Sequence, residues 1–532
     1  MQRHSLSTRL KRGLDKWRLV FLVFLVVYVS FLLLDLGTLT LQWDEANHLN
    51  GGLLLLHGHF RHYVESSMFY PPLDDLILAG YFSVGGATLF TGRLVSLTFA
   101  ILSVALVFEF TYRTFGAKTA LVSSILLATM PGFVWLSRLA MLETMLIFFF
   151  SASMFLFFTW LQRHENKHLV LSGIALGLGF LTKYQIIIAV IAMVASVLLL
   201  CQSCIKAKLS RFPLLILAAV IVVLPWIVVS YQVYSMGMLN QWMYALEIGN
   251  PQKLIYSLRF PTPIFYLIEL TWPYGVVHPI SLFIYIFGLL GLGVLLWRRK
   301  PEDKFLLIWF FAVYIFFTLI GNKQWRYVVP IFPVLAISAA SLMTFAYGKT
   351  EKAWNQAKSG LNKKRIGKVA AGFLIATVAF SVGYSCLDAY HWVAKDTAFN
   401  LPGEPATNYV AERLNVNESM VVLCALNVFS QDTVKFYLYS RGSKLNFVGQ
   451  YPELPVDTYT PYFSVDELIG LCTKRNVKYL LFFEYGETYP YFNSTLNMQA
   501  IYQMLMDSQK FTCQASFGNY PCRIFVLSPI YV

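Results

Sequence analysis

Residues 17–48 read WRLVFLVFLVVYVSFLLLDLGTLTLQWDEANH and join a long apolar segment to two adjacent carboxylates. The apolar part ends at Leu34 and is long enough to cross a bilayer, which takes about 20 residues. Asp44 and Glu45 follow the chain exit at Leu36-Gly37, so we expect them at or just outside the membrane face. Carboxylates at such a surface are costly unless they take part in chemistry or bind a cation, although Asp and Glu also favour the first turn of a solvated helix. The stretch therefore predicts a membrane anchor followed by either a functional carboxylate pair or an ordinary helix start.

The composition is that of a membrane protein. Hydrophobic residues make up 57% of the chain and charged residues only 13%, which excludes an ordinary soluble globular protein. The net charge of +14 could indicate a nucleic-acid partner, but the basic residues lie beside apolar segments. Those before and at the start of the first segment are Arg3, Arg9, Lys11, Arg12, Lys16 and Arg18. No small-residue cleavage site follows that segment, so it is predicted to remain as a signal anchor. We expect contact with a lipid bilayer and none with nucleic acid.

Eleven apolar segments are predicted to span the membrane, several of them short enough to need tilt. They are 17–35, 94–112, 119–134, 141–160, 169–182, 184–200, 213–231, 278–297, 305–320, 327–346 and 369–387. The N-terminus and every second loop together hold 24 of the 42 Lys and Arg residues. Basic residues favour the cytoplasmic side, so this alternation predicts a cytoplasmic N-terminus. With eleven spans, Asp44, Glu45 and the C-terminal region are then extracytoplasmic.

The region after residue 388 changes in character, because its apolar runs shorten to five or six residues and polar residues fill the gaps. The predicted elements are strands at 420–424 and 479–483, helices at 432–439 and 466–474, and a closing hairpin over 511–527. Alternating strands and helices favour a small α/β domain with a partly parallel sheet. We therefore predict an α-helical polytopic membrane domain over 1–388, with a catalytic first outer loop at 37–93, and an extracytoplasmic α/β domain over 389–532.

Charged residues recur at the outer ends of the predicted spans. Besides Asp44 and Glu45, they include the following: Arg138, Glu143, Lys183 and Arg326. A single Lys or Arg in such a place more often extends its charged end to the membrane surface than takes part in a site. Here several outer loops that are otherwise poor in charge each carry such residues, which indicates instead that these residues converge on one site. Carboxylates beside cations suit an anionic, lipid-borne phosphate next to a proton acceptor.

Six short motifs resemble those of the GT-C superfamily of membrane glycosyltransferases. The resemblance is to the branch that contains the protein O-mannosyltransferases of glycosyltransferase family 39 and the aminoarabinose transferase of lipid A. The matching residues are Asp44-Glu45, Tyr70-Pro71-Pro72-Leu73, Arg93-Leu94-Val95-Ser96, Ser137-Arg138-Leu139-Ala140 with Glu143, GIALGLGFLTK at 173–183, and Arg326-Tyr327-Val328-Val329-Pro330. They span roughly residues 40–340. Tyr70 stands where many relatives have histidine, and Glu143 where aspartate is usual.

The resemblance implies transfer of a sugar from a polyprenyl- or dolichyl-phosphate donor to a hydroxyl of a protein, lipid or glycan, with inversion at the anomeric carbon. Asp44 would be the base, with Glu45 and Glu143 as further catalytic carboxylates. The implied phosphate ligands are Arg138, Lys183 and Arg326, and the implied substrate contacts are His48, Tyr70, Arg93 and Tyr327. No cofactor is required by this chemistry, although a divalent cation between Asp44 and Glu143 is compatible with it.

The sequence also allows other functions for the protein. A related membrane polysaccharide or lipid-glycan transfer enzyme would share the donor chemistry. A transporter would show internal repeats and charges near the centres of its spans, which the sequence does not show. A non-catalytic membrane scaffold would need none of the charged residues for turnover.

Overall fold

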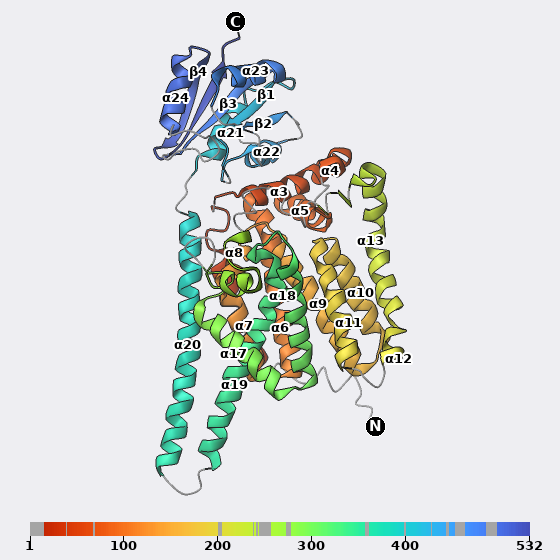
Figure 1. Cartoon of the computed structure of the whole chain (residues 1–532). Helices are drawn as coiled ribbons and strands as arrows, with labels where there is room; N and C mark the ends of the chain where they lie inside the picture. The colour runs from red at the N-terminus through yellow and green to blue at the C-terminus, as the bar shows by residue number, and fades with distance from the viewer. Residues whose placement is uncertain are drawn as a thin grey trace.

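Figure 1 shows the computed structural model of the chain as a helical bundle with a small mixed domain at one end. The structure describes residues 15–38, 40–66, 70–200, 205–237, 239–240, 243, 257–272, 278–356, 361–397, 401–426, 428–442, 446–452, 463–485 and 497–531. The basic residues Arg3, Arg9, Lys11 and Arg12, on which the signal-anchor prediction partly depends, lie outside these ranges.

Helices make up the first three quarters of the chain. They are α2 (Lys16–Leu33), α3 (Trp43–Leu56), α4 (Phe60–Ser66), α5 (Leu73–Gly85), α6 (Leu89–Thr114), α7 (Ala117–Thr129), α8 (Pro131–Ser137), α9 (Glu143–Arg163), α10 (Asn166–Phe180), η1 (Tyr184–Ile187), α11 (Ile188–Leu200), α12 (Ile205–Leu209), α13 (Phe212–Tyr234), η2 (Thr262–Ile264), α16 (Phe265–Glu269), α17 (Leu282–Arg298), α18 (Pro301–Leu319), η3 (Trp325–Ile331), α19 (Phe332–Gln356) and α20 (Leu361–Thr397).

Each of the eleven predicted spans coincides with helix in the structure. Within the described residues, six helices are long and apolar enough to cross a membrane, or seven if the bent pair α7 and α8 forms one span. That pair bends by 68° at Pro131, where the ring removes a backbone donor. Helix α10 has only 15 residues, and α18 opens on the charged residues Glu302, Asp303 and Lys304. The chain is thus an integral membrane protein, and the count of eleven stays a prediction.

The first outer loop folds into the three helices α3, α4 and α5, which lie across one end of the bundle (Figure 1). Two glycines of α3 let α5 approach closely. A Cβ on Gly51 would lie 2.6 Å from the Asp75 carboxylate, and one on Gly52 would lie 2.7 Å from Leu78 Cβ. Asp44 and Glu45 lie in the first turn of α3.

The C-terminal region is a five-stranded sheet with helices, as the sequence predicts. Its elements are α21 (Gly403–Ala411), β1 (Ser419–Leu423), α22 (Gln431–Tyr439), β2 (Val448–Tyr451), α23 (Val465–Arg475), β3 (Val477–Tyr485), α24 (Met498–Asp507), β4 (Phe511–Asn519) and β5 (Cys522–Pro529). The strand order is β2-β1-β3-β5-β4, with β2, β1 and β3 parallel and the β4–β5 hairpin antiparallel. The domain boundary at 388 stays a prediction, because α20 continues through it.

This sheet domain rests on α3 through α22. Trp43 Nε1 donates to Asp432 Oδ2 at 2.6 Å, and Asn50 Nδ2 donates to the Asp432 carbonyl at 2.9 Å. His57 Nε2 lies 3.2 Å from the Tyr439 carbonyl. The helix that carries Asp44 and Glu45 is therefore held between the bundle and the C-terminal domain (Figure 1).

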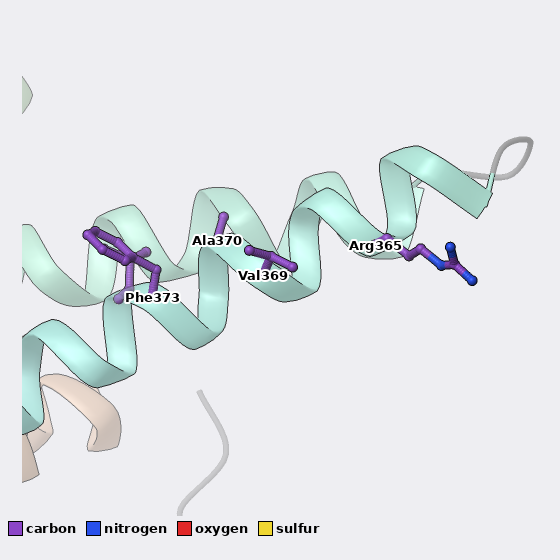
Figure 2. Close-up of a pocket in the computed structure, with 5 residues that line it drawn as sticks. Arg365, Val369, Ala370 and Phe373 are labelled. Carbon is purple, nitrogen blue, oxygen red and sulfur yellow. The ribbon is translucent and has the colours of Figure 1, made fainter.

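A hollow on α20 lies far from this junction. Figure 2 shows it near the start of that helix. Its lining residues are Arg365, Val369, Ala370, Phe373 and Leu374. All five belong to one helix and only Arg365 is charged, so the hollow offers no set of converging polar groups for chemistry.

Candidate functional site

A chain of alternating charges joins four elements at the outer-loop end of the bundle. Arg326 Nη2, in η3, donates to Asp44 Oδ2 at 2.8 Å. Arg326 Nη1 lies 3.9 Å from Glu143 Oε1, at the start of α9. Lys183 Nζ, just before η1, donates to that same Glu143 oxygen at 3.0 Å. The structure thus brings together four of the residues that the sequence singled out from four separate loops.

Burial differs along this chain of charges. The Glu143 side chain is only 3% exposed, whereas Lys183 is 15%, Arg326 is 22% and Asp44 is 52% exposed. The start of α9 suits an anion, because the N-terminus of a helix carries partial positive charge. The buried Glu143 therefore anchors two partly accessible cations, and Asp44 lies at the open side of the group.

Asp44 is ionised at neutral pH. Partial burial raises the pKa of its carboxyl, but the bonded Arg326 guanidinium, with His48 and Lys183 nearby, lowers it by more. The net pKa lies below the ordinary value of 3.8. Asp44 can thus accept a proton throughout the physiological range.

Two tyrosines lie beside the charged residues. The Lys183 ammonium is 5.9 Å from the centroid of the Tyr327 ring, and the Tyr327 hydroxyl accepts from Asn322 Nδ2 at 3.2 Å. Tyr70 meets His48 edge-on, with ring centroids 4.7 Å apart. Burial and the nearby Asp44 carboxylate raise the pKa of Tyr70, so its phenol stays neutral. Substrate contacts by Tyr70 and Tyr327 remain predictions that this placement allows.

Glu45 and Arg93 form a buried pair instead of facing the site. Arg93 Nε and Nη2 donate to the two Glu45 oxygens at 2.6 and 2.8 Å, and neither side chain has any exposed surface. The Ala140 amide donates to Glu45 as well, at 2.8 Å, and Arg93 Nη1 donates to the Leu36 carbonyl, also at 2.8 Å. Substrate contact by Arg93 and a catalytic role of Glu45 stay predictions, and in this structure the pair joins the loops around it.

Arg138 is also placed differently from the prediction. Its guanidinium donates to the carbonyl oxygens of Phe31, Leu32 and Leu34, the Leu32 distance being 2.9 Å. Carbonyls in the last turn of a helix lack partners within the helix and carry partial negative charge. Arg138 is 2% exposed and caps the end of α2. Phosphate binding by Arg138 stays a prediction, and in this structure its guanidinium is bonded to these carbonyls.

Two acidic residues escaped the sequence prediction. Asp74 and Asp75, in the first turn of α5, lie beside His48 of α3. These three buried residues offer ligand atoms that all lie within 4.8 Å of one another. The available signal was their position directly after Tyr70-Pro71-Pro72-Leu73, the motif that was already assigned to the site.

A divalent ion between Asp44 and Glu143, which the chemistry allows but does not require, stays untested. Arg326 bonds to Asp44 and lies against Glu143, and Lys183 bonds to Glu143. Cationic side chains thus occupy the place of an ion on both carboxylates.

The sequence is similar to those of known membrane glycosyltransferases. Residues 70–229 match the dolichyl-phosphate-mannose-protein mannosyltransferase family. The undecaprenyl phosphate-alpha-4-amino-4-deoxy-L-arabinose arabinosyl transferase of Pectobacterium atrosepticum is 26% identical over 266 residues, which cover 48% of this chain and 46% of that protein. The chain therefore spans about half the length of this curated relative.

Two solved structures share the architecture over most of the chain. ArnT from Cupriavidus metallidurans in the apo state has a TM-score of 0.63 at 15% identity, covering 95% of this chain and 97% of ArnT. The archaeal oligosaccharyltransferase AglB from Archaeoglobus fulgidus has a TM-score of 0.57 at 13% identity, covering 88% of this chain and 70% of AglB. By sequence and by fold, the chain is related to the protein mannosyltransferases and aminoarabinose transferases of the GT-C superfamily of membrane glycosyltransferases.

Proposed function

We propose that the chain transfers a sugar from a polyprenyl-phosphate donor to an acceptor hydroxyl on the extracytoplasmic face of the membrane. The observation that carries the proposal is the group Asp44, Arg326, Glu143 and Lys183. It sets an ionised, half-exposed carboxylate next to two cations that a buried acid holds in place.

Each part of this group has a task in the reaction. The acceptor O–H loses its proton to Asp44 while its oxygen bonds to the anomeric carbon. The bond from that carbon to the phosphate oxygen breaks, and the phosphate departs with the electron pair. Lys183 and Arg326 stabilise the charge that develops on the phosphate, and Glu143 keeps both cations oriented before the substrate arrives. A single displacement of this kind inverts the anomeric configuration.

The relatives supply candidates for the substrates. The matched family transfers mannose from dolichyl phosphate to protein, and the curated relatives transfer 4-amino-4-deoxy-L-arabinose from undecaprenyl phosphate. ArnT has been solved with undecaprenyl phosphate, and AglB with an inhibitory peptide and a dolichol phosphate. We infer that the donor is one of these sugars linked to a polyprenyl phosphate. The acceptor is then a lipid, a protein or a glycan. No cofactor beyond the side chains of the group is proposed.

The cations give the first test of donor binding. The Lys183→Met substitution should weaken binding of a polyprenyl-phosphate sugar about 10–150-fold, because a hydrogen bond to a charged group contributes about 1.5–3 kcal/mol. Donor affinity is measured with both mannosyl and aminoarabinosyl donors on full-length protein in lipid nanodiscs. Lys183→Met combined with Glu143→Gln separates the loss of the cation from the cost of leaving a buried acid unpaired.

Arg61→Ala provides the matched control for Lys183→Met. Arg61 belongs to the first outer loop, is 92% exposed and bonds only to Glu65 within the described residues. Its variant should bind donor like the unchanged protein. Equal donor affinity in Lys183→Met and Arg61→Ala would contradict the proposed phosphate contact.

The second test concerns the side of the membrane. A reporter fused after residue 532 should be extracytoplasmic, and one inserted near residue 358 should be cytoplasmic. The contacts of Trp43 and Asn50 with Asp432 put Asp44 and the C-terminal domain at the same end of the bundle. Accessibility of both reporters to a membrane-impermeant label distinguishes the two faces. Finding both on one side would contradict the proposed orientation.

A further inference from the structure

His48, Asp74 and Asp75 form a compact group behind the charged site. His48 lies one helical turn after Asp44 on α3, so both face the same side of that helix. The two aspartates occupy the first turn of α5, which packs against α3. His48 Nδ1 is 3.9 Å from Asp75 Oδ1, and the ligand atoms of all three side chains lie within 4.8 Å of one another.

One oxygen of each carboxylate in this group has no hydrogen-bond donor among the described residues. Asp74 is 2% exposed and Asp75 is 5% exposed, yet Asp74 Oδ2 and Asp75 Oδ1 accept no hydrogen bond from any residue that the structure describes. A buried carboxylate costs free energy unless it is paired, hydrogen-bonded or bound to a metal. Two adjacent carboxylates share one imidazole here, and the neighbouring cations Arg326 and Lys183 already bond to Asp44 and Glu143.

The surroundings hold Asp75 toward His48 and not toward solvent. The Tyr63 hydroxyl donates to Asp75 Oδ2 at 2.9 Å, leaving Oδ1 as the oxygen directed at the imidazole. Gly51 makes room for this carboxylate, because any Cβ there would lie 2.6 Å from it. Such outer hydrogen bonds commonly orient the ligands of metal sites.

We propose that His48, Asp74 and Asp75 bind one divalent transition-metal ion, with Zn²⁺ as the best match. One imidazole nitrogen and two carboxylate oxygens are ligands that Zn²⁺ accepts at about 2.0–2.2 Å. Ligand atoms around a tetrahedral ion lie about 3.4 Å apart, so small side-chain rotations bring this group to the required spacing. Two carboxylates and a neutral imidazole balance the ion's charge.

The ion would join α3 to α5 one turn away from Asp44. It would therefore fix the orientation of the helix that carries the candidate base, without contacting the transferred sugar. This proposal does not depend on the transfer reaction, because its ligands are separate from Asp44, Glu143, Lys183 and Arg326. Failure of one proposal leaves the other open to its own test.

Metal content tests the site directly. Full-length protein in detergent is stripped with a chelator, incubated with Zn²⁺ alone, desalted and measured by elemental mass spectrometry. We expect about one Zn²⁺ per chain and a higher thermal midpoint with Zn²⁺ than with chelator, because a ligand that binds only the folded state stabilises it. Asp74→Asn and His48→Gln should each weaken Zn²⁺ binding at least tenfold in competition with a chromophoric chelator.

Glu65→Gln is the matched control, because it removes a carboxylate from the same outer loop outside the group. It should keep full Zn²⁺ binding. Co²⁺ bound in place of Zn²⁺ gives visible absorption bands that report nitrogen and oxygen ligands, and these bands should disappear in Asp74→Asn. Unchanged protein that retains no stoichiometric Zn²⁺ and no Co²⁺ bands would overturn the proposal and leave a proton on Asp74 as the means of neutralising the group. Equal loss in Glu65→Gln would overturn it too, because binding would then not involve these ligands.

Discussion

Replacing Asp44 by Asn should lower the rate of sugar transfer about 10²–10⁴-fold, the usual effect of removing a general base. The substitution keeps the size of the side chain and its ability to accept from Arg326, which now donates to Asp44 Oδ2 at 2.8 Å. Donor affinity should be unchanged or higher, because Arg326 would no longer be shared with a carboxylate. Single-turnover transfer and donor binding, measured on the same preparation, separate the chemical step from binding.

Glu65→Gln again serves as the control, since it changes an exposed acid of the same loop. The pH profile gives an independent check. Arg326 holds the pKa of Asp44 below 3.8, so Asp44 stays deprotonated and the rate it supports should be level from about pH 5 upward. That rate should be lost only as the pH falls through the lowered pKa. A normal rate of sugar transfer in Asp44→Asn would exclude Asp44 as the base.

Several features of the fold and site could be predicted because polar residues are conspicuous in an apolar chain. Asp44, Glu143, Lys183 and Arg326 come from four loops, and the alternation of basic residues put those loops on one side of the membrane. Their convergence follows from the cost of leaving charges unpaired beside a bilayer. The partly parallel C-terminal sheet was predictable for a similar reason, because its short apolar runs alternate with amphipathic helices.

The sequence could not predict which way several of these side chains point, because that depends on how the helices pack. Asp44 and Glu45 are adjacent, but successive residues of an α-helix point about 100° apart, so only one of them faces the site. Arg138 carries the charge that suits a phosphate, yet its guanidinium donates hydrogen bonds to the carbonyls at the end of α2. Asp74 and Asp75 resemble an ordinary acidic helix start, and only the packing of α5 on Gly51 reveals that they face His48.

Because Glu45 is buried against Arg93, we expect a large loss of stability when this ion pair is broken. Glu45→Gln should destabilise the protein by about 3–5 kcal/mol, because removing one partner leaves a buried charge uncompensated. Arg93 would keep its bonds to the Leu36 and Thr40 carbonyls but lose both charged oxygens. The thermal midpoint of the full-length protein in detergent measures the effect.

Two comparisons identify the buried charge as the cause. Replacing both residues by methionine should recover much of the loss, because a well-packed apolar pair can substitute for a buried ion pair. Glu109→Gln breaks the ion pairs of Glu109 with Arg18 and Arg113, in which Glu109 is 35%, Arg18 44% and Arg113 62% exposed. It should lower the midpoint far less, because solvent screens such charges. If Glu45→Gln were as stable as Glu109→Gln while transfer failed, Glu45 would return to the reaction as a catalytic group. If instead stability falls and the surviving folded protein transfers sugar at a normal rate, the two adjacent carboxylates have separate tasks: Asp44 meets the substrate, and Glu45 holds together the loops that present it.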